Sequence, residues 1–294
     1  MDESRRPTSI ALGSSQDRTT DSHLCVEVIR SKSSLTPRVG IILGTGLGEF
    51  AETLEERVEF AYAEIPGFPV PSAAGHRGRL ILGKIGRVDV AVLQGRCHLY
   101  EGRAYEEVCH PVRTLHRLGV SSLITTCAAG GLATDLRVGD LLVLQDHVNL
   151  QFRRSVNFTN GFQFPYCERT SEKLLEIMRK QDIPGRLGSY LAVTGPNYET
   201  RAELRFFRRI ADSIGMSTIP EVLTAHQLGM SVASLATITN VCNPDQAIVA
   251  DCDHVIAAAA ETAPRVRRLI TTFLENGLCR SDTMSPVTAS QTLK

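Results

Sequence analysis

Two segments of this chain carry residue types that suit an anion, and each comes directly after an apolar run. Arg96 and His98 follow the run at residues 88–93, and the glycine-rich segment GTGLG (44–48) follows the run at residues 39–43. A guanidinium presents a planar fork of N–H donors that matches a phosphate, and a histidine two residues further along an extended chain points to the same side. Backbone amides in a glycine turn can close on an anion. Both segments therefore indicate phosphate binding.

Each segment also has an explanation that needs no ligand. GTGLG could be a plain glycine turn, because its spacing is neither the G-x-G-x-x-G dinucleotide fingerprint nor a nucleotide P-loop. The segment QGRCHLYEG (94–102) could be a surface turn that holds an Arg–Glu ion pair. Neither segment by itself distinguishes a phosphate-binding site from a turn without a ligand.

Two further segments follow predicted strands. TCAAGGL (126–132) is rich in small residues that permit a close backbone approach to a ligand, although tight packing would explain them equally well. GPNYET (195–200) offers Tyr198 as a stacking face and Glu199 as a hydrogen-bond acceptor. The alternative for Glu199 is an acid at a helix N-terminus that interacts with the helix dipole.

The last two segments are GMSTIPE (215–221) and ITN (238–240). Ser217 and Thr218 could simply cap the following helix, and Asn240 could simply end a strand. All six segments nevertheless fall at strand ends of one chain. Together they supply an anion cradle, an aromatic or thioether face, an acceptor and an amide, and this coincidence favours a ligand site.

The elements that must position these residues alternate along the chain. Strands are predicted at residues 39–43, 88–93, 122–126, 140–144, 188–194 and 231–239. Helices are predicted at residues 104–118, 170–181, 200–210, 221–228 and 254–275. This alternation predicts an α/β fold with a largely parallel sheet flanked by helices, in which ligands bind at the carboxyl ends of the strands.

Length and composition narrow the class of protein. The 294 residues fit one globular domain, which we expect at residues 24–279, between disordered segments at residues 1–23 and 280–294. Charges balance at 32 basic and 32 acidic residues, which argues against nucleic acid or an anionic membrane as partner. No apolar stretch approaches the roughly 20 residues of a membrane span, and residues 1–24 lack an apolar signal core. Eight cysteines without a C-x-x-C pair indicate reduced thiols, no zinc site and a cytosolic protein.

Considered together, seven collinear stretches resemble the trimeric purine nucleoside phosphorylase family over about residues 24–279. They are GTGLG, AGHRGRL, LQGRCHLYEG, AAGGL with the following GDLLVLQDHVNL, GPNYETRAELR, GMSTIPEV and ITN. The resemblance implies a single-domain α/β phosphorylase-type fold with a mixed central sheet. It also implies a homotrimer that cleaves purine nucleosides with phosphate to give a free base and ribose 1-phosphate. Phosphate is a co-substrate, and neither a metal nor an organic cofactor is implied.

The resemblance further implies residue roles. Phosphate binding falls to Thr45, His76, Arg96, His98, the backbone amide of Ala128, and Ser217. Purine binding falls to Tyr198, Glu199 and Asn240, and ribose binding to Tyr100, Met216 and His254. The residues expected to act in catalysis are Glu199, Asn240 and His98. An Asn at position 240 favours 6-oxopurines such as inosine and guanosine, because its amide can donate to O6 and accept from a protonated N7.

The chain departs from the family pattern at several positions. Thr45 stands where the family usually has Ser, and Cys97 and Cys127 replace an aromatic residue and an Asn. The segment at residues 149–165 is shorter than usual, and Phe164 is the best candidate for a residue that completes the neighbouring subunit's site. Depending on a two-residue gap, His254 or Cys252 occupies the position of the histidine that meets the ribose 5′-hydroxyl. A cysteine there would favour substrates with a modified 5′ group.

Other functions remain open from the sequence. One is methylthioadenosine or broad-specificity purine phosphorolysis, although that relative typically has Asp at position 240. Another is a nicotinamide-dependent oxidoreductase built on GTGLG, which is disfavoured because no acidic residue ends a second strand about 20 residues on. A third is a non-catalytic nucleoside-binding relative.

Overall fold

The structure, a computed structural model, describes residues 15–151, 164–246 and 251–276. One half of its sheet is an open array in the order β2-β3-β4-β1-β5. These strands are β1 (Val39–Leu43), β2 (Glu55–Ala61), β3 (Arg79–Ile85), β4 (Val88–Gln94) and β5 (Ser122–Gly131). β4, β1 and β5 run parallel, so the segments that follow them leave the sheet at the same edge.

The other half of the sheet closes on itself. Its further strands are β6 (Leu141–Asn149), β7 (Gly185–Ala192), β8 (Ser213–Gly215) and β9 (Ser231–Val241). β5 pairs with both β8 and β9, and the circuit β5-β8-β7-β6-β9 returns to β5. Five pairings of the described strands are parallel: β1–β4, β1–β5, β5–β9, β6–β7 and β7–β8. Four are antiparallel: β2–β3, β3–β4, β5–β8 and β6–β9. The predicted mixed sheet is confirmed.

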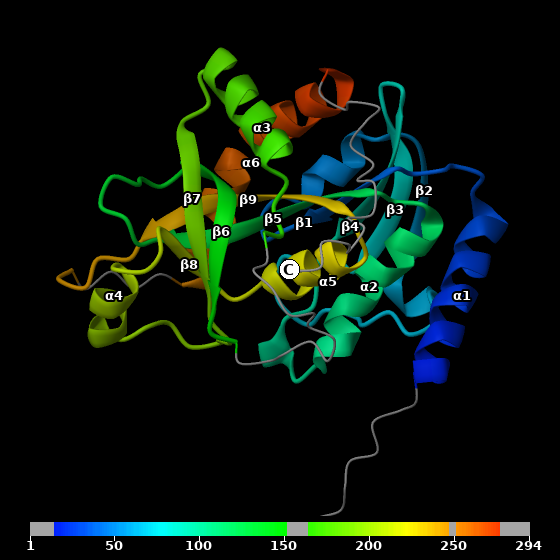
Figure 1. Ribbon diagram of the computed structural model, residues 1–294, viewed down its shortest axis with the longest axis horizontal. Helices are drawn as coiled ribbons and strands as arrows, with labels where there is room; N and C mark the ends of the chain where they lie inside the picture. The colour runs from blue at the N-terminus through cyan, green and yellow to red at the C-terminus, as the bar shows by residue number, and fades with distance from the viewer. Residues whose placement is uncertain (1–14, 152–163, 247–250, 277–294) are drawn as a thin grey trace, which may run out of the picture.

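Helices cover both faces of the sheet (Figure 1). α1 (Ser15–Lys32), α2 (Tyr105–Leu118) and α5 (Ile219–Gln227) pack together on one face, while α3 (Glu168–Lys180) and α6 (Cys252–Asn276) pack on the other. The short α4 (Arg201–Phe207) follows β7 and packs through Phe207 against a small separate cluster.

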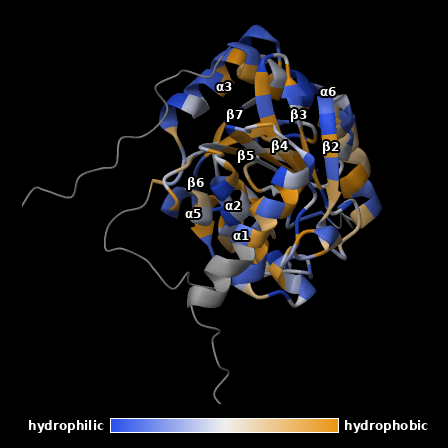
Figure 2. Cartoon of the chain, turned by 90° about the vertical axis from the view of Figure 1, so that its right-hand side faces the viewer, coloured by the Kyte–Doolittle hydropathy of each residue, from blue (hydrophilic) through white to orange (hydrophobic). Residues whose placement is uncertain are grey.

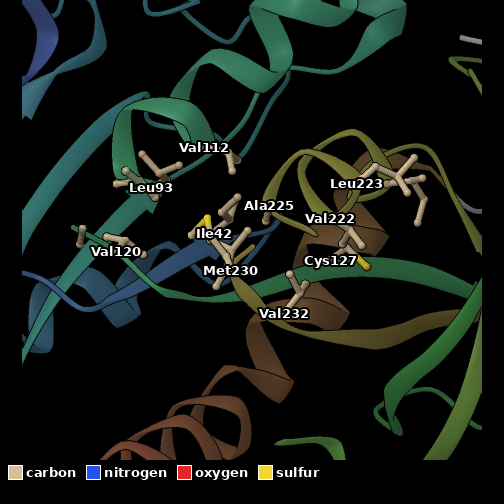
Figure 3. Close-up of a cluster of buried hydrophobic side chains, with 14 of the residues drawn as sticks. Ile42, Leu93, Val112, Val120, Cys127, Val222, Leu223, Ala225, Met230 and Val232 are labelled. Carbon is tan, nitrogen blue, oxygen red and sulfur yellow. The ribbon is translucent and has the colours of Figure 1, made fainter. Parts of the chain in front are cut away.

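Strand alternation divides the core between the two helical layers. In β1, Ile42 joins the cluster under α2 and α5, whereas Ile41 and Leu43 join the cluster under α3 and α6. Figure 3 shows Ile42 among side chains from α2 and α5, and Figure 2 shows apolar residues concentrated along the interior strands. The strands are thus held rigidly from both sides, which fixes the positions of the residues that follow them.

The structure corrects two expectations. The predicted strands all exist, but β2, β3 and β8 are additional. The edge strand β2 (EERVEFA) is mostly exposed and polar, and β8 has only three residues, so neither gives an apolar signal. The disorder predicted for residues 1–23 is wrong from residue 15 on, because α1 begins there; the helix docks onto α2 through the buried Cys25 and Ile29. Residues 1–14 and 280–294 lie outside the described residues.

Candidate active site

A cavity of about 140 Å³ lies at the carboxyl ends of β1, β4, β5 and β9. It brings together ten of the twelve residues proposed from the sequence: Thr45, His76, Arg96, His98, Ala128, Tyr198, Glu199, Met216, Ser217 and Asn240. The same edge of the sheet was expected from the parallel strand order. The two proposed residues that do not line it are Tyr100 and His254.

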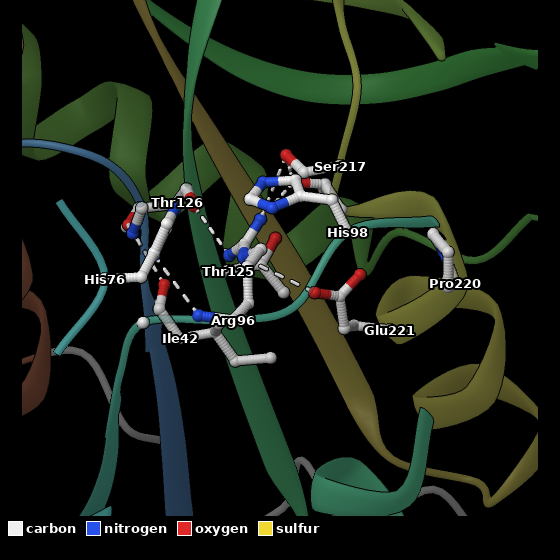
Figure 4. A network of polar contacts seen from close by, with 12 residues as sticks. Ile42, His76, Arg96, His98, Thr125, Thr126, Ser217, Pro220 and Glu221 are labelled. Atoms are coloured by element: carbon white, nitrogen blue, oxygen red, sulfur yellow. Dashed lines mark hydrogen bonds and ion pairs between the residues drawn. The ribbon is translucent and has the colours of Figure 1, made fainter. Parts of the chain in front are cut away.

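Arg96 forms the centre of the anion-binding end. It is 5% exposed, and Nη1 donates to Ser217 Oγ at 3.2 Å and to Thr218 Oγ1 at 2.7 Å. Nη2 donates to the backbone oxygen of Thr126 at 2.7 Å (Figure 4). The alternative of a surface turn is therefore wrong, because burial and these bonds hold the guanidinium in one orientation.

Thr218 holds an unusual backbone conformation that serves this arrangement. Its φ of 72° and ψ of −46°, with Ile219 N–H donating to Ser217 C=O at 2.8 Å, describe a classic γ-turn, which is a strained conformation for a β-branched residue. Thr218 is the N-cap of α5, yet its side chain makes no capping bond. Its hydroxyl accepts from Arg96 instead, so the capping explanation is wrong for Thr218.

His76 is a neutral donor in this site. The Arg96 backbone N–H donates to His76 Nδ1 at 3.2 Å, so the ring proton sits on Nε2, which lies 3.3 Å from Thr45 Oγ1. Burial, followed by repulsion from His98 and Arg96, lowers the pKa of His76 to about 3. His76 can thus offer an N–H to phosphate without adding a charge.

His98 is oriented by Glu101. One Glu101 oxygen accepts from the backbone N–H of His98 at 2.6 Å and from Nδ1 at 3.0 Å, and the other accepts from the backbone and hydroxyl of Ser72. Burial alone would raise the pKa of Glu101, but the hydrogen bonds from His98 and Ser72 hold it well below its usual range. The carboxylate therefore keeps the His98 proton on Nδ1 and leaves Nε2 for a ligand.

Tyr100 lies behind His98 rather than in the cavity wall. The two rings stack with centroids 4.8 Å apart and planes at 14°. Gly195, with a φ of 75°, lies against Tyr100 and Met216, and a Cβ there would collide with the Met216 sulfur. Met216 itself lines the cavity.

Glu199 is the acidic residue in the cavity lining. Burial raises its pKa above the usual range, which is opposite to the effect of a helix dipole. The first turn of α4 is capped instead by Thr200, whose hydroxyl and backbone exchange bonds with Glu203. Glu199 therefore makes no bond in the cap of α4, and neighbouring Tyr198 is 53% exposed.

Asn240 is aimed by a bulge in β9. The register with β5 shifts between Ala129 and Gly130, so that Gly130 pairs with Asn240. Thr239 Oγ1 donates to Asn240 Oδ1 at 3.2 Å, and Asn240 Nδ2 donates to Cys242 Sγ at 3.5 Å. One lone pair on Oδ1 and one hydrogen on Nδ2 are left for a ligand.

The structure places His254 outside the cavity. α6 begins at Cys252, and Asp251 accepts from the backbone N–H of His254 and pairs with its Nδ1 at 2.8 Å. The imidazole is 79% exposed, and Val255 lines the cavity in its place. Neither His254 nor Cys252 is among the lining residues, so the assignment of His254 to the ribose is corrected.

Comparisons with known proteins show the family of this chain. The model of the phosphorylase superfamily matches residues 38–275. Purine nucleoside phosphorylase 1 of Bacillus subtilis is 43% identical over 215 residues, which cover 70% of this chain and 79% of that protein. The chain belongs to the purine nucleoside phosphorylase family.

Two solved phosphorylases have the same fold. A schistosome purine nucleoside phosphorylase in complex with hypoxanthine superimposes with a TM-score of 0.82 at 29% identity, covering 88% of this chain and 98% of that one. Isoform 2 from Schistosoma mansoni, in complex with cytosine and ribose 1-phosphate, gives a TM-score of 0.81 at 29% identity over 88% and 97% of the two chains.

Several residues that support this phosphorylase site were not proposed from the sequence. They are Glu101, Thr126, Thr218, Glu221, Thr239 and Cys242. All except Cys242 lie inside the quoted segments, but their types suit a cap, a strand or a surface ion pair equally well. Only the burial of these side chains and their contacts in the folded chain distinguish a role in the site from a role as a cap, a strand residue or a surface ion pair. Among the described parts of the phosphorylase, no cluster of three metal-ligating side chains occurs, and no helix is long and apolar enough to cross a membrane.

The raised pKa of Glu199 predicts a pH dependence for this phosphorylase. If Glu199 binds the purine N1–H, the carboxylate accepts it more strongly than the protonated acid does, so kcat/KM for inosine should fall as the pH drops through a pKa above the ordinary value of Glu. Glu199→Gln should lower kcat/KM ten- to hundredfold, from the loss of about 1.5 to 3 kcal/mol of a charged hydrogen bond, and should remove this acid limb. The pH profile of inosine cleavage measures both.

Glu203→Gln is the matched control, since Glu203 belongs to the same turn but caps α4. It should keep the acid limb. An unchanged limb in Glu199→Gln would show that another group sets it.

Proposed function

We propose that this family member cleaves the N-glycosidic bond of 6-oxopurine nucleosides, inosine and guanosine, with inorganic phosphate. The products are the free base and ribose 1-phosphate. The observation that carries the proposal is one cavity whose lining combines a buried arginine and its hydroxyl partners with a carboxylate and an amide.

The phosphate end would serve both binding and bond formation. Arg96 supplies charge, and Thr45, Ser217, His76 and the Ala128 amide would donate hydrogen bonds to the phosphate oxygens. His98 Nε2 would accept from the P–OH of hydrogen phosphate, because Glu101 keeps the ring proton on Nδ1. A phosphate oxygen attacks the anomeric carbon as the bond to the purine breaks, and the bonding electrons leave with the base. The sugar passes through an oxocarbenium-like state, so the phosphate dianion also stabilises its positive charge.

The base end would stabilise the leaving group. Negative charge accumulates on the departing purine, and a protonated N7 relieves it. Asn240 would accept from N7–H through Oδ1 and donate to O6 through Nδ2, while Glu199 accepts from N1–H. Tyr198 would flank the ring. N7 takes its proton from water as the glycosidic bond breaks, and hydrogen phosphate releases its own proton to water as the new C–O bond forms. The bond from Asn240 to O6 strengthens as the purine takes on negative charge, and the bond from N7–H forms only then, so Asn240 acts mainly in the transition state, whereas Glu199 fixes the N1 edge of the base.

Inosine incubated with and without phosphate tests this function. We expect hypoxanthine and ribose 1-phosphate in equal amounts only when phosphate is present, and matched amounts of guanine from guanosine. Equal cleavage without phosphate would identify a hydrolase. Absence of cleavage of inosine, guanosine and methylthioadenosine under both conditions would identify a non-catalytic nucleoside-binding protein.

A second candidate activity is phosphorolysis of 5′-modified purine nucleosides such as methylthioadenosine. The position of His254 favours it, because the exposed imidazole lies outside the cavity lining, where it does not meet a 5′-hydroxyl. Asn240 opposes the adenine base of that substrate. Product analysis with inosine, adenosine and methylthioadenosine separates the two activities.

A homotrimer is part of the proposal, as is a cytosolic location, which the cysteine pattern supports. Phe164 is 80% exposed, as expected for a side chain that would be covered by a neighbouring subunit. We expect sedimentation to give a trimer and Phe164→Ala to raise KM for inosine about tenfold, whereas Phe206→Ala, another exposed phenylalanine at 58%, should not. A fully active monomer would contradict this prediction.

A further inference from the structure

The guanidinium of Arg96 meets a buried carboxylate that the proposed chemistry does not use. Arg96 Nε lies 3.3 Å from Glu221 Oε1, and both side chains are 4% exposed (Figure 4). Within the described residues, neither oxygen of Glu221 accepts a hydrogen bond, and Arg96 Nε makes none. A carboxylate is costly to bury without a partner, so the charge of Arg96 is what makes this position of Glu221 tolerable.

The carboxylate comes from the same short segment as two other Arg96 partners. Ser217 Oγ and Thr218 Oγ1 both accept from Nη1, and Glu221 stands in the first turn of α5 directly after the strained turn at Thr218. The first turn of a helix also favours a negative charge. One segment therefore engages the guanidinium at Nη1 and at Nε, which fixes the plane of the fork.

Glu221 lies on the side of Arg96 away from the ligand cavity. Arg96 lines two cavities, the active-site cavity and a small one of about 10 Å³. Glu221 lines only the second, together with apolar residues such as Val108 and Val112. It is thus placed to act on phosphate through Arg96 rather than by touching it.

We propose that Glu221 is a positioning residue that holds the Arg96 guanidinium in its phosphate-binding orientation. This inference rests on the proposed function, because it assumes that Arg96 binds phosphate. With Nε paired to Glu221 and Nη1 bonded to two hydroxyls, one N–H of Nη2 is left for phosphate, and the Ser217 hydroxyl hydrogen is left as well when Thr218 donates across the 3.3 Å contact between the two hydroxyls. Without the carboxylate, the Nε side of the fork loses the charge that faces it, and only the bonds to Ser217, Thr218 and Thr126 restrain the guanidinium, so its donors are less precisely placed.

Three substitutions separate orientation from charge. Glu221→Leu removes both the acceptor and the charge and should raise KM for phosphate at least tenfold. Glu221→Asp keeps the charge but withdraws it by one methylene, and should also raise KM for phosphate severalfold. Glu221→Gln keeps an acceptor at the same reach and should stay within about threefold of the parent. KM for inosine, at saturating phosphate, should change less than twofold in all three.

Val222→Ala is the matched control, since it loosens the fully buried neighbour on the same helix without reaching Arg96. It should lower the thermal unfolding temperature but leave KM for phosphate unchanged. In an Arg96→Gln background, Glu221→Leu should have no further effect on KM for phosphate, because the residue it positions is gone. If Glu221→Leu does not fold, Glu221→Asp and Glu221→Gln carry the same comparison.

Other results would overturn the inference. A lower KM for phosphate in Glu221→Gln and Glu221→Leu would mean that the carboxylate only opposes phosphate by its charge. An additive effect in the Arg96→Gln background would mean that Glu221 does not act through Arg96. A parent enzyme whose cleavage needs no phosphate would instead refute the proposed function, which the same titration reveals.

Discussion

Arg96→Ala should raise KM for phosphate about a hundredfold or more while changing KM for inosine less than threefold. The guanidinium is the cation in the cavity lining, and its loss removes at least one charge-assisted hydrogen bond, worth about 1.5 to 3 kcal/mol, together with the positive charge itself. Steady-state titration with each substrate in turn measures the two constants. A similar rise in both would indicate general disorder of the site rather than the loss of phosphate binding.

The same substitution should also destabilise the protein. It leaves Glu221 buried without its cation, and breaking a buried pair from one side costs about 3 to 5 kcal/mol. Arg57→Ala is the control, because Arg57 pairs with Glu52 at the surface. Such exposed pairs contribute about 0 to 1 kcal/mol, so both the stability and KM for phosphate should stay near those of the parent. Equal destabilisation by the two variants would contradict the burial argument.

Asn240→Asp should shift the ratio of inosine to adenosine efficiency about a hundredfold toward adenosine. A carboxylate can accept from both the 6-amino group and N7–H of adenine, but it cannot donate to O6 of hypoxanthine. Each misplaced buried polar group costs about 1 to 3 kcal/mol, and the variant gains with one base while it loses with the other. The ratio of kcat/KM for the two nucleosides is the measurement.

Asn243→Asp controls for the added charge, since Asn243 lies three residues further on and outside the cavity wall. It should keep the parent ratio. If Asn240→Asp also keeps it, Asn240 does not read the base. The bonds from Thr239 and to Cys242 give a reason to expect a strong effect, because they hold the amide in one orientation.

The sequence was most informative about the strands that enter the site. Apolar runs bounded by glycine and polar segments predict β1, β4 and β5 correctly, because strands buried on both faces contain few polar residues. It was least informative about β2 and β8. An exposed edge strand needs no apolar run, and a three-residue strand is defined by its partners rather than by its own sequence.

By itself, the sequence determined the α/β class, the family and ten residues of the cavity. These depend on short motifs that occur in the same order along this chain as in the family. Only the tertiary structure decided which contacts the individual side chains make. Thr218 reads as a helix cap and Glu221 as a helix-start acid, yet both contact Arg96, which is more than 120 residues away in the chain. His254 reads as a ligand, yet a capping contact with Asp251 holds it in solvent. Local sequence sets the chemistry that a side chain can perform, whereas burial and long-range packing decide which partner it meets.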